Sequence, residues 1–207
     1  MKANREKTKT PFWRLVVDLL LILVLAVGAT ILLQSFVIKS FGVTSSSMSP
    51  TIEPGDKLMA DRITFYFRKP RRGDIVLFRY PPTGPQSMNT TNLWYWPFEQ
   101  IGETLHLAHR NTSPPFVKRV VATEGETLHV KDGLLYINGK QVKEPYAVRD
   151  ASNFGPVKVG PGMVYCFGDN RPDSNDSRYW GPVPVRSIIG RAVFRYWPFS
   201  RFGMPQG

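Results

Sequence analysis

Residues 45–51 (SSSMSPT) place three consecutive hydroxyl groups directly before a methionine, followed by Ser49 and Pro50. Serine side chains compete with the backbone for hydrogen bonds, so a serine-rich stretch beside proline is usually a plain loop. A serine hydroxyl is also a nucleophile when a neighbouring base removes its proton. The stretch therefore predicts acyl-transfer chemistry only if the rest of the chain supplies that base.

The histidines are the conventional candidates for the base. His106 and His109 lie in a segment without a strand pattern, and His129 alternates with apolar neighbours on a predicted hairpin strand. An ordinary surface or strand histidine is the better interpretation of each. A Ser-His-Asp triad is therefore weakly supported.

Lys118 is a different kind of candidate base, because it lies within the strand-like run FVKRVV of residues 116–121. On a strand it shares one face with Phe116 and Val120, which surround its amine with apolar groups. Burial disfavours the ammonium and leaves neutral amine to accept a proton. Arg119 cannot do this, because its guanidinium stays charged. The competing interpretation is a Lys-Arg pair at a solvent-facing sheet edge.

An apolar segment precedes the serines and predicts a membrane anchor. Leu19 to Ile38 contains no charged residue and is long enough to span a bilayer core of roughly 30 Å. We expect a basic stub at 1–14, a transmembrane signal-anchor at 15–38 and a catalytic domain at 39–207. A cleavable signal is the competing interpretation, but no A-x-A site follows. Upstream of the segment lie Lys2, Arg5, Lys7, Lys9 and Arg14, whereas Lys39 alone follows closely.

This charge asymmetry places the N-terminus in the cytoplasm and the following domain outside. The net charge of +11 suits either nucleic acid or an anionic membrane surface. Because the basic surplus includes the stub and no nucleic-acid signature is present, we expect a lipid bilayer and no nucleic acid as partner. Asp18, near the inner end of the anchor, is interpreted as an interfacial residue.

The exported part predicts a mainly β fold in which antiparallel strands form a barrel-like domain. Asp132-Gly133 and Asn138-Gly139 supply the positive φ angles of two tight hairpin turns. Cys166 stands alone in an apolar run, which excludes an intramolecular disulfide and favours a small buried side chain. The predicted strands are IVLFRY (75–80), FVKRVVA (116–122), TLHV (127–130), LLYI (134–137), MVYCF (163–167) and IIGRAVFRYW (188–197).

Residues 81–115 break this strand pattern and predict an inserted excursion. The segment combines several prolines with the aromatic run LWYWPFE, and the tripeptide WPF returns at 197–199. The aromatic run either rests at the bilayer interface or packs on the barrel. Two short matches without a fixed period do not indicate a repeat.

Four sequence blocks resemble the bacterial type I signal peptidases, a serine/lysine-dyad family also called leader peptidases. Residues 45–51 resemble the S-x-S-M-x-P-T signature, shortly after the anchor, and RGDIV at 72–76 resembles a second block. FVKRVV at 116–121 resembles the block that carries the catalytic lysine. GDNRPDSNDSRYWG at 168–181 resembles the GDNR-x-x-S-x-D-SR-x-WG block. Four blocks in family order make chance agreement very improbable.

The resemblance implies a role for each matched residue. Ser47 is the expected nucleophile and Lys118 the expected general base. Ser45 is expected to supply a hydroxyl to the oxyanion hole beside the Ser47 backbone N–H, and Ser174 to orient the lysine amine. These roles agree with physical requirements, since an oxyanion needs preorganised donors and a neutral lysine needs a neutral partner.

Other matched residues are expected to support the site. A carboxylate beside Lys118 would favour its charged form, so Asp176 and Arg178 are interpreted as a structural ion pair. Residues 169–171 are expected to shape the turn that presents Ser174. Where the family usually has G-x-P-G-D, residues 122–126 read ATEGE, so this turn is expected to differ. The residues flanking the dyad, expected to line substrate pockets, are Val43, Ile52, Phe116 and Val117.

The expected function is a membrane-bound serine endopeptidase that cleaves signal peptides from exported preproteins after a small-x-small motif. The resemblance implies no metal and no cofactor. One alternative is a processing peptidase of the same fold with narrower specificity, and another is an inactive, membrane-anchored binding or scaffold relative. The membrane is a bacterial plasma membrane or a thylakoid, and the oligomeric state is left open.

Overall fold

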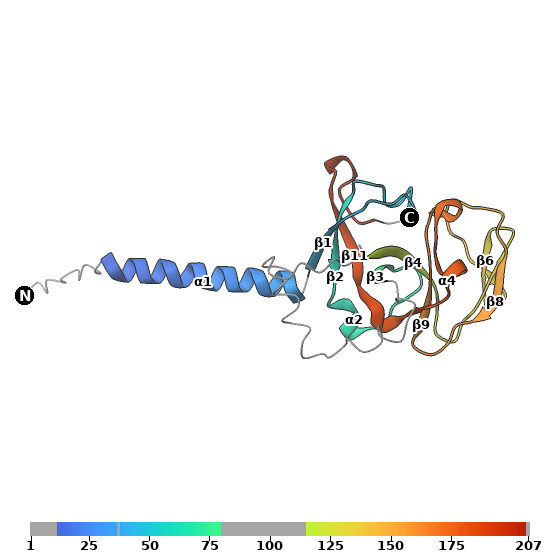
Figure 1. Ribbon diagram of the computed structural model, residues 1–207, viewed down its shortest axis with the longest axis horizontal. Helices are drawn as coiled ribbons and strands as arrows, with labels where there is room; N and C mark the ends of the chain where they lie inside the picture. The colour runs from blue at the N-terminus through green and yellow to red at the C-terminus, as the bar shows by residue number, and fades with distance from the viewer. Residues whose placement is uncertain (1–11, 37, 80–114, 206–207) are drawn as a thin grey trace, which may run out of the picture.

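The computed structural model describes residues 12–36, 38–79 and 115–205. Figure 1 shows a long N-terminal helix, α1 (Phe12–Phe36), that projects from a body of strands. Among the described residues, one helical segment, Phe12–Thr30, is long and apolar enough to cross a membrane, and none of it is buried. The chain enters its first strand at Ile38, where the predicted anchor was expected to end.

The body contains two antiparallel sheets. The larger has the order β1-β2-β11-β3-β4-β9-β10 and curls around its core, and the smaller has the order β7-β6-β5-β8 (Figure 1). The larger sheet comprises β1 (Ile38–Gly42), β2 (Lys57–Asp61), β3 (Ile75–Phe78), β4 (Phe116–Thr123), β9 (Met163–Phe167), β10 (Val183–Pro184) and β11 (Ile188–Trp197). The smaller comprises β5 (Thr127–Lys131), β6 (Leu134–Ile137), β7 (Lys140–Gln141) and β8 (Phe154–Lys158).

Short helical turns connect several strands. They are α2 (Thr64–Phe67), η2 (Arg171–Asp173), α4 (Ser177–Trp180), η3 (Val185–Ser187) and η4 (Phe199–Arg201). The prediction of a mainly antiparallel β domain behind one apolar helix is confirmed. The excursion expected at 81–115 lies, except for Pro115, outside the described residues, as do His106 and His109.

The hairpins of the smaller sheet have the turns that their sequence predicts. Asp132 and Gly133 have φ angles of 49° and 73°, and Asn138 and Gly139 have φ angles of 52° and 77°. Each pair forms a two-residue loop between paired strands, since Lys131 lies opposite Leu134 and Ile137 opposite Lys140. Positive φ at both loop positions gives the backbone the twist that an antiparallel hairpin needs.

Strand β4 lies at the centre of the fold and carries the lysine expected to be the base. It pairs with β3 on one side and β9 on the other, so both of its edges are hydrogen-bonded. The pairing with β9 shifts register between Val120 and Ala122, which is the mark of a bulge. Val120 belongs to a core cluster with Val76 and Phe78, whereas Val121 packs with the smaller sheet. Both faces of β4 are therefore covered.

Candidate active site

The loop after β1 holds Ser47 in place through buried neighbours. Met48 and Ile52 are 1% and 0% exposed, and they pack together in a core cluster. The backbone N–H of Ile52 donates to the Met48 carbonyl at 2.9 Å, and the backbone N–H of Asn170 donates to the Ser47 carbonyl at 3.1 Å. Met48 and Ile52 thus anchor the loop in the core, and these contacts hold Ser47 in position.

Lys118 occupies the middle of β4, opposite Val76 of β3. Its side chain is only 2% exposed, so the amine is almost completely removed from water. The amine nitrogen Nζ donates a hydrogen bond of 3.0 Å to Oγ of Ser174. The alternative of a solvent-facing sheet edge does not apply, because β4 is paired on both sides.

Ser174 connects the lysine to a carboxylate. Its Oγ donates to Oδ2 of Asp176 at 2.8 Å, and the same carboxylate oxygen accepts from the backbone N–H of Gly168 at 3.0 Å. Gly168 also permits the close approach of two segments, because a Cβ at this position would overlap the Ser174 hydroxyl and the Ser47 carbonyl. A side chain here would separate the segment that holds Ser47 from the segment that holds Ser174.

Burial lowers the pKa of Lys118 from 10.5 to about 8, because the apolar surroundings do not solvate an ammonium. The negative charge of Asp176 acts in the opposite direction, and the positive charge of Arg178 compensates for part of it. Asp169 and Asp173 also favour the charged amine, with smaller effects. Since burial outweighs these charges, much of the amine is neutral near pH 8.

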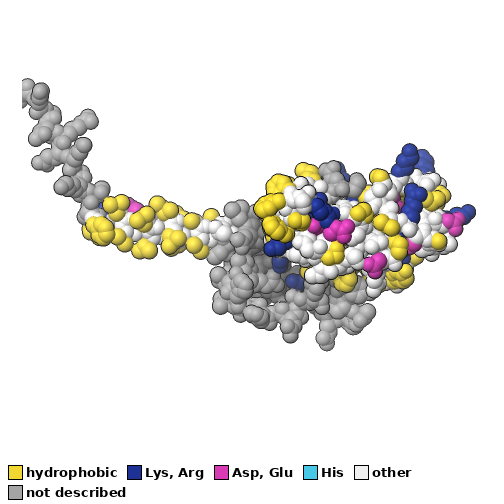
Figure 2. Space-filling model, turned by 90° about the horizontal axis from the view of Figure 1, so that it is seen from above, with side chains coloured by type: hydrophobic (Ala, Val, Ile, Leu, Met, Phe, Trp, Pro, Cys, Tyr) yellow, Lys and Arg dark blue, Asp and Glu magenta, His cyan; other side chains and the backbone are white. Residues whose placement is uncertain are grey.

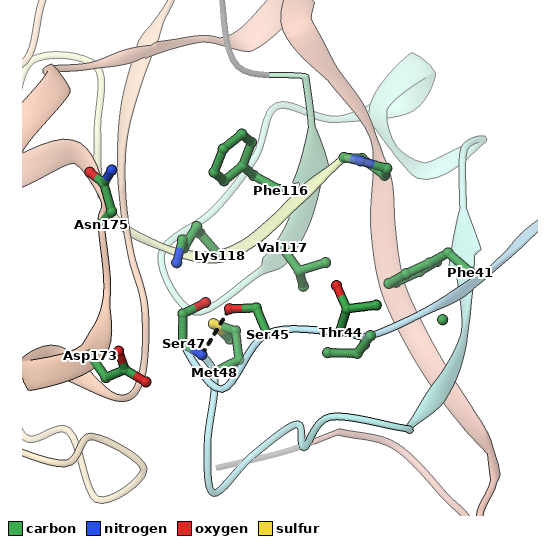
Figure 3. A pocket seen from close by; sticks show the side chains of 13 residues that line it. Phe41, Thr44, Ser45, Ser47, Met48, Phe116, Val117, Lys118, Asp173 and Asn175 are labelled. Atoms are coloured by element: carbon green, nitrogen blue, oxygen red, sulfur yellow. Dashed lines mark hydrogen bonds between the residues drawn. The ribbon is translucent and has the colours of Figure 1, made fainter. Parts of the chain in front are cut away.

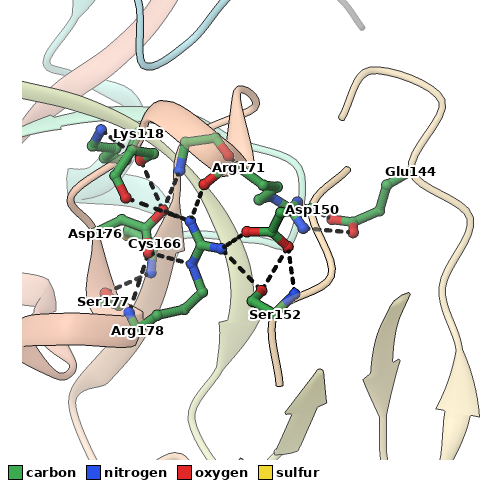
Figure 4. Close-up of polar contacts among 11 residues, drawn as sticks. Lys118, Glu144, Asp150, Ser152, Cys166, Arg171, Asp176, Ser177 and Arg178 are labelled. Carbon is green, nitrogen blue, oxygen red and sulfur yellow. Dashed lines mark hydrogen bonds and ion pairs between the residues drawn. The ribbon is translucent and has the colours of Figure 1, made fainter. Parts of the chain in front are cut away.

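Arg178 links Asp176 to neighbouring segments through several hydrogen bonds (Figure 4). Its Nε donates to Oδ1 of Asp176 at 2.9 Å, and its Nη1 donates to Oδ2 of Asp150 at 2.7 Å. A third bond runs from Nη2 to the Arg171 carbonyl at 2.7 Å. The Asp176–Arg178 ion pair therefore belongs to a network that fixes the position of the carboxylate beneath Ser174.

Two further buried ion pairs hold the segment before Ser174. Arg119, which points away from Lys118, donates twice to Asp169 at 2.8 and 2.7 Å. Arg171 donates twice to Glu144 at 3.1 and 2.7 Å. Bidentate pairs of this kind fix geometry as well as charge. Within the same segment, the side-chain amide of Asn170 donates to the Ser46 carbonyl at 3.3 Å.

The expected oxyanion-hole donors lie next to each other. The backbone N–H of Ser47 donates to Oγ of Ser45 at 3.2 Å, so the two groups are in contact. Ser45 is exposed, whereas Ser47 is 7% exposed. The Ser47 N–H and the Ser45 hydroxyl, expected to form the oxyanion hole, are therefore neighbours in this loop.

Ser47 and Lys118 line the same pocket, of about 370 Å³ (Figure 3). Of the four residues expected to contact substrate, Val43, Phe116 and Val117 line this pocket. Ile52 is fully buried instead, because the turn that joins it to Met48 directs it into the core behind the pocket. The remaining lining residues are Phe41, Gly42, Thr44, Ser45, Met48, Pro115, Asp173 and Asn175.

Sequence reasoning missed three features of this site. Gly168 opens the matched block at 168–181, so a signal for it was present, but its role depends on contacts across the fold. Phe41 lies on a strand that the sequence pattern did not reveal, and Asp173 ends η2, just after the residues 169–171 that were expected to shape the turn before Ser174. Neither carried a signal that pointed to the pocket.

The other reactive side chains lie apart from this chemistry. His129 is on β5 of the smaller sheet, with its ring 6.0 Å from that of Tyr136. Cys166 is fully buried, and burial raises the pKa of its thiol. Within the described ranges, no three His, Cys, Asp or Glu side chains cluster as metal ligands would.

Comparison with known proteins identifies the class to which this fold and site belong. Residues 16–197 match the family described as "Signal peptidase, peptidase S26". A probable signal peptidase I from Synechocystis sp. is 34% identical over 192 residues, which cover 92% of this chain and 87% of that protein. Thylakoidal processing peptidase 1 of Arabidopsis thaliana is 37% identical over 85% of this chain, but the match spans only 47% of that longer protein. A crystal structure of a signal peptidase I from Enterococcus faecalis has a TM-score of 0.42 and 26% identity, covering 61% of this chain and 98% of that one.

The chain belongs to the peptidase S26 family of signal peptidases. The resemblance predicted from the four sequence blocks is thereby confirmed, and the chain is a serine endopeptidase of the signal peptidase I type. The family and the apolar helix together indicate a membrane-anchored protein.

Proposed function

We propose that this protein cleaves signal peptides from exported preproteins, with Ser47 as nucleophile and Lys118 as general base. The observation that carries the proposal is the burial of Lys118, which lowers its pKa to about 8 while its amine nitrogen lies 3.0 Å from the Ser174 hydroxyl. A neutral amine held in a fixed place and sharing a pocket with a serine satisfies the two requirements of a Ser/Lys dyad.

The direction of the hydrogen bonds around Ser174 supports this role of the lysine. A serine hydroxyl has one proton, and Ser174 donates it to Asp176. Ser174 must therefore act as the acceptor toward Lys118, which donates one of its N–H groups. The lone pair of the neutral amine is left free for the proton of Ser47. Asp176 thus acts through Ser174, and its own charge is compensated by Arg178.

The proposed reaction follows from these positions. Lys118 takes the proton of the Ser47 hydroxyl while Oγ attacks the scissile carbonyl. The Ser47 N–H and the Ser45 hydroxyl donate to the oxyanion, a contribution typically worth about 3 kcal/mol for each donor. The Lys118 ammonium then protonates the leaving amine, and water hydrolyses the acyl-enzyme with Lys118 again as base. These steps use only groups of this chain and water, so the proposal includes no metal and no cofactor.

The pocket supports recognition of small side chains before the cut. Val43, Phe116 and Val117 give one part of it an apolar lining. Ser45 and Ser47 follow the end of β1 at Gly42, and Phe116 begins β4, so the pocket lies between two extended segments. A peptide added as a strand in this position would use its backbone for affinity and alternate side chains for specificity. We propose that small residues at the first and third positions before the cut occupy the apolar part.

The membrane arrangement is part of the same proposal. Helix α1 ends at Phe36 and Ser47 follows within eleven residues, which span at most about 40 Å even when fully extended. The dyad is therefore tethered near the membrane surface, where a signal peptide arrives. The basic residues before the helix support a cytoplasmic N-terminus and a catalytic domain on the other side of a plasma or thylakoid membrane.

A preprotein panel tests this function. The full chain in neutral detergent is incubated with several preproteins that carry Ala-x-Ala before the cut, and with matched versions that carry Leu at either Ala position. Mass spectrometry then identifies each new N-terminus. We expect cleavage of all the Ala-x-Ala substrates and of none of the Leu versions. Cleavage of only one preprotein would favour a narrower processing peptidase, and no cleavage by the folded chain would favour an inactive binding relative.

A further inference from the structure

The pocket that contains the dyad has two ends of different chemistry (Figure 3). Phe41, Thr44 and Val117 lie on one side of Ser47, and Asp173 and Asn175 lie on the opposite side. The first end is largely apolar, and the second carries a carboxylate and an amide. A peptide that crosses Ser47 must therefore leave one environment and enter the other.

Asp173 differs from the acidic residues that build the site. Asp169, Asp176 and Glu144 are buried and paired with arginines. Asp173 is exposed, and among the described residues no basic side chain forms an ion pair with it. One of its carboxylate oxygens, Oδ2, accepts a hydrogen bond from the Ser46 hydroxyl. The second oxygen remains available to a ligand.

Asn175 adds hydrogen-bonding capacity at the same end. It is exposed and lines the pocket, and no side-chain hydrogen bond involves it within the described part of the chain. Among the described lining residues, the other ionisable group is Lys118, which is buried. Asp173 therefore determines the sign of the charge that a peptide meets at this end of the pocket.

We propose that Asp173 is a specificity-determining residue for the segment that follows the cut, favouring basic side chains and disfavouring acidic ones there. The inference rests on the proposed function, because small side chains before the cut occupy the apolar end. The leaving segment must then pass Asp173 and Asn175. A carboxylate attracts a Lys or Arg side chain and repels an Asp or Glu side chain that passes close to it at a partly solvated surface.

Six peptides test the inference when they share one Ala-x-Ala sequence and differ only after the cut. They carry Lys, Gln or Glu at the first or second position after it, one position at a time. The full chain in neutral detergent cleaves each, and kcat/KM is measured for wild type, Asp173→Asn and Asp173→Lys. The readout is the Lys-to-Glu ratio of kcat/KM within each variant, which is independent of changes in overall rate.

The expected wild-type ratio at one of the two positions is about two- to fivefold in favour of Lys, the range for a partly exposed charge pair. It should decrease with added salt, because solvated charges are screened. Asp173→Asn should bring the ratio to about one or below, and Asp173→Lys should invert it. Asp132→Asn is the matched control, because Asp132 is also exposed but lies in the β5–β6 turn, and it should keep the wild-type ratio.

The asparagine variant separates recognition from structure. Its side-chain oxygen can still accept from Ser46, so if the role of Asp173 were purely structural, Asp173→Asn would leave the Lys-to-Glu ratio unchanged whatever its effect on the overall rate. That result, or a wild-type ratio of one at both positions, would overturn the inference while the proposed function stands. If the folded wild type cleaved none of the six peptides, the proposed function and this inference would fail together.

Discussion

The Lys118 amine lies 3.0 Å from the Ser174 hydroxyl, although 56 residues separate the two in the sequence. This hydroxyl gives its proton to Asp176 and so accepts from the lysine. The amine is thereby oriented by a group that adds no charge of its own. The proposed base and the residue proposed to orient it come from the central strand β4 and from the segment between η2 and α4.

Replacement of Ser174 by Ala should lower kcat by roughly tenfold to a thousandfold, within the range that a well-placed base contributes. The amine would lose its acceptor and rotate among several positions. Cleavage of an Ala-x-Ala peptide measures the effect. Ser200→Ala, at an exposed serine of η4, is the matched control and should retain wild-type kcat. Equal rates for both variants would contradict the orienting role.

The pH dependence of activity should report the lysine. In the proposed mechanism the neutral form of Lys118 is the active one, and burial lowers the pKa of this residue to about 8. We therefore expect kcat/KM to rise with pH through about 8 and to fall tenfold for each pH unit well below it. The profile is measured on the free enzyme with a substrate that has no group titrating in this range. A flat profile between pH 6 and 9 would contradict a lysine base.

The same burial predicts that the catalytic lysine destabilises the fold near neutral pH. The pKa of Lys118 is about 8 in the folded chain and 10.5 without the shift. Between pH 8 and pH 10.5 the unfolded chain therefore binds more protons than the folded chain, and the free energy of unfolding rises with pH. At pH 7 the full cost of burying a charged Lys118 is present, and it lowers the free energy of unfolding by up to about 3 kcal/mol. Lys118→Met removes the charge and retains much of the volume. It should be inactive yet unfold at higher denaturant than wild type.

The measurement for this prediction is denaturant unfolding of both proteins in the same detergent at pH 7 and at pH 10.5. The excess stability of Lys118→Met should be present at the lower pH and should disappear at the higher one. If Lys118→Met were less stable than wild type at pH 7, the lysine would not carry the burial penalty on which the low pKa depends.

Gly168→Ala should reduce activity by at least tenfold, because the added methyl overlaps the Ser174 hydroxyl and the Ser47 carbonyl. The segments that carry Ser47 and Ser174 must then separate. Gly125→Ala is a control with open space around it, although its φ of 83° makes it mildly destabilising. kcat is measured alongside thermal unfolding. A Gly168→Ala variant with wild-type kcat would show that the close approach is not required.

Much of the fold follows from the sequence pattern. The hairpin β5–β6 has the strands and the two-residue turn that Asp132-Gly133 predicts, since positive φ is a local property of these residues. In contrast, strands β1 and β2 were not predicted, because their pairing brings Ile38–Gly42 and Lys57–Asp61 together across the serine loop. Pairing of this kind is decided by contacts between segments rather than by local preference.

The candidate site likewise has features that the sequence predicted and features that only the folded arrangement reveals. The residue types and the matched blocks predicted Ser47 and Lys118 as the dyad, but the burial of Lys118 depends on the pairing of β4 with β3 and β9, which spacing alone does not reveal. Ile52 is an instructive difference, since it was expected in the pocket and instead packs behind Met48. Four residues along a tight turn are enough to move a side chain from the pocket to the core.

The most direct test of the central claim compares wild type, Ser47→Ala and Lys118→Arg on one Ala-x-Ala preprotein, with circular dichroism to show that all three are folded. Mass spectrometry of the products identifies any new N-terminus. The dyad predicts a single cut after the second Ala by wild type. It predicts no cut by either variant, since alanine lacks the nucleophile and arginine keeps its proton. A normal cut by Ser47→Ala or by Lys118→Arg would contradict the Ser47/Lys118 mechanism.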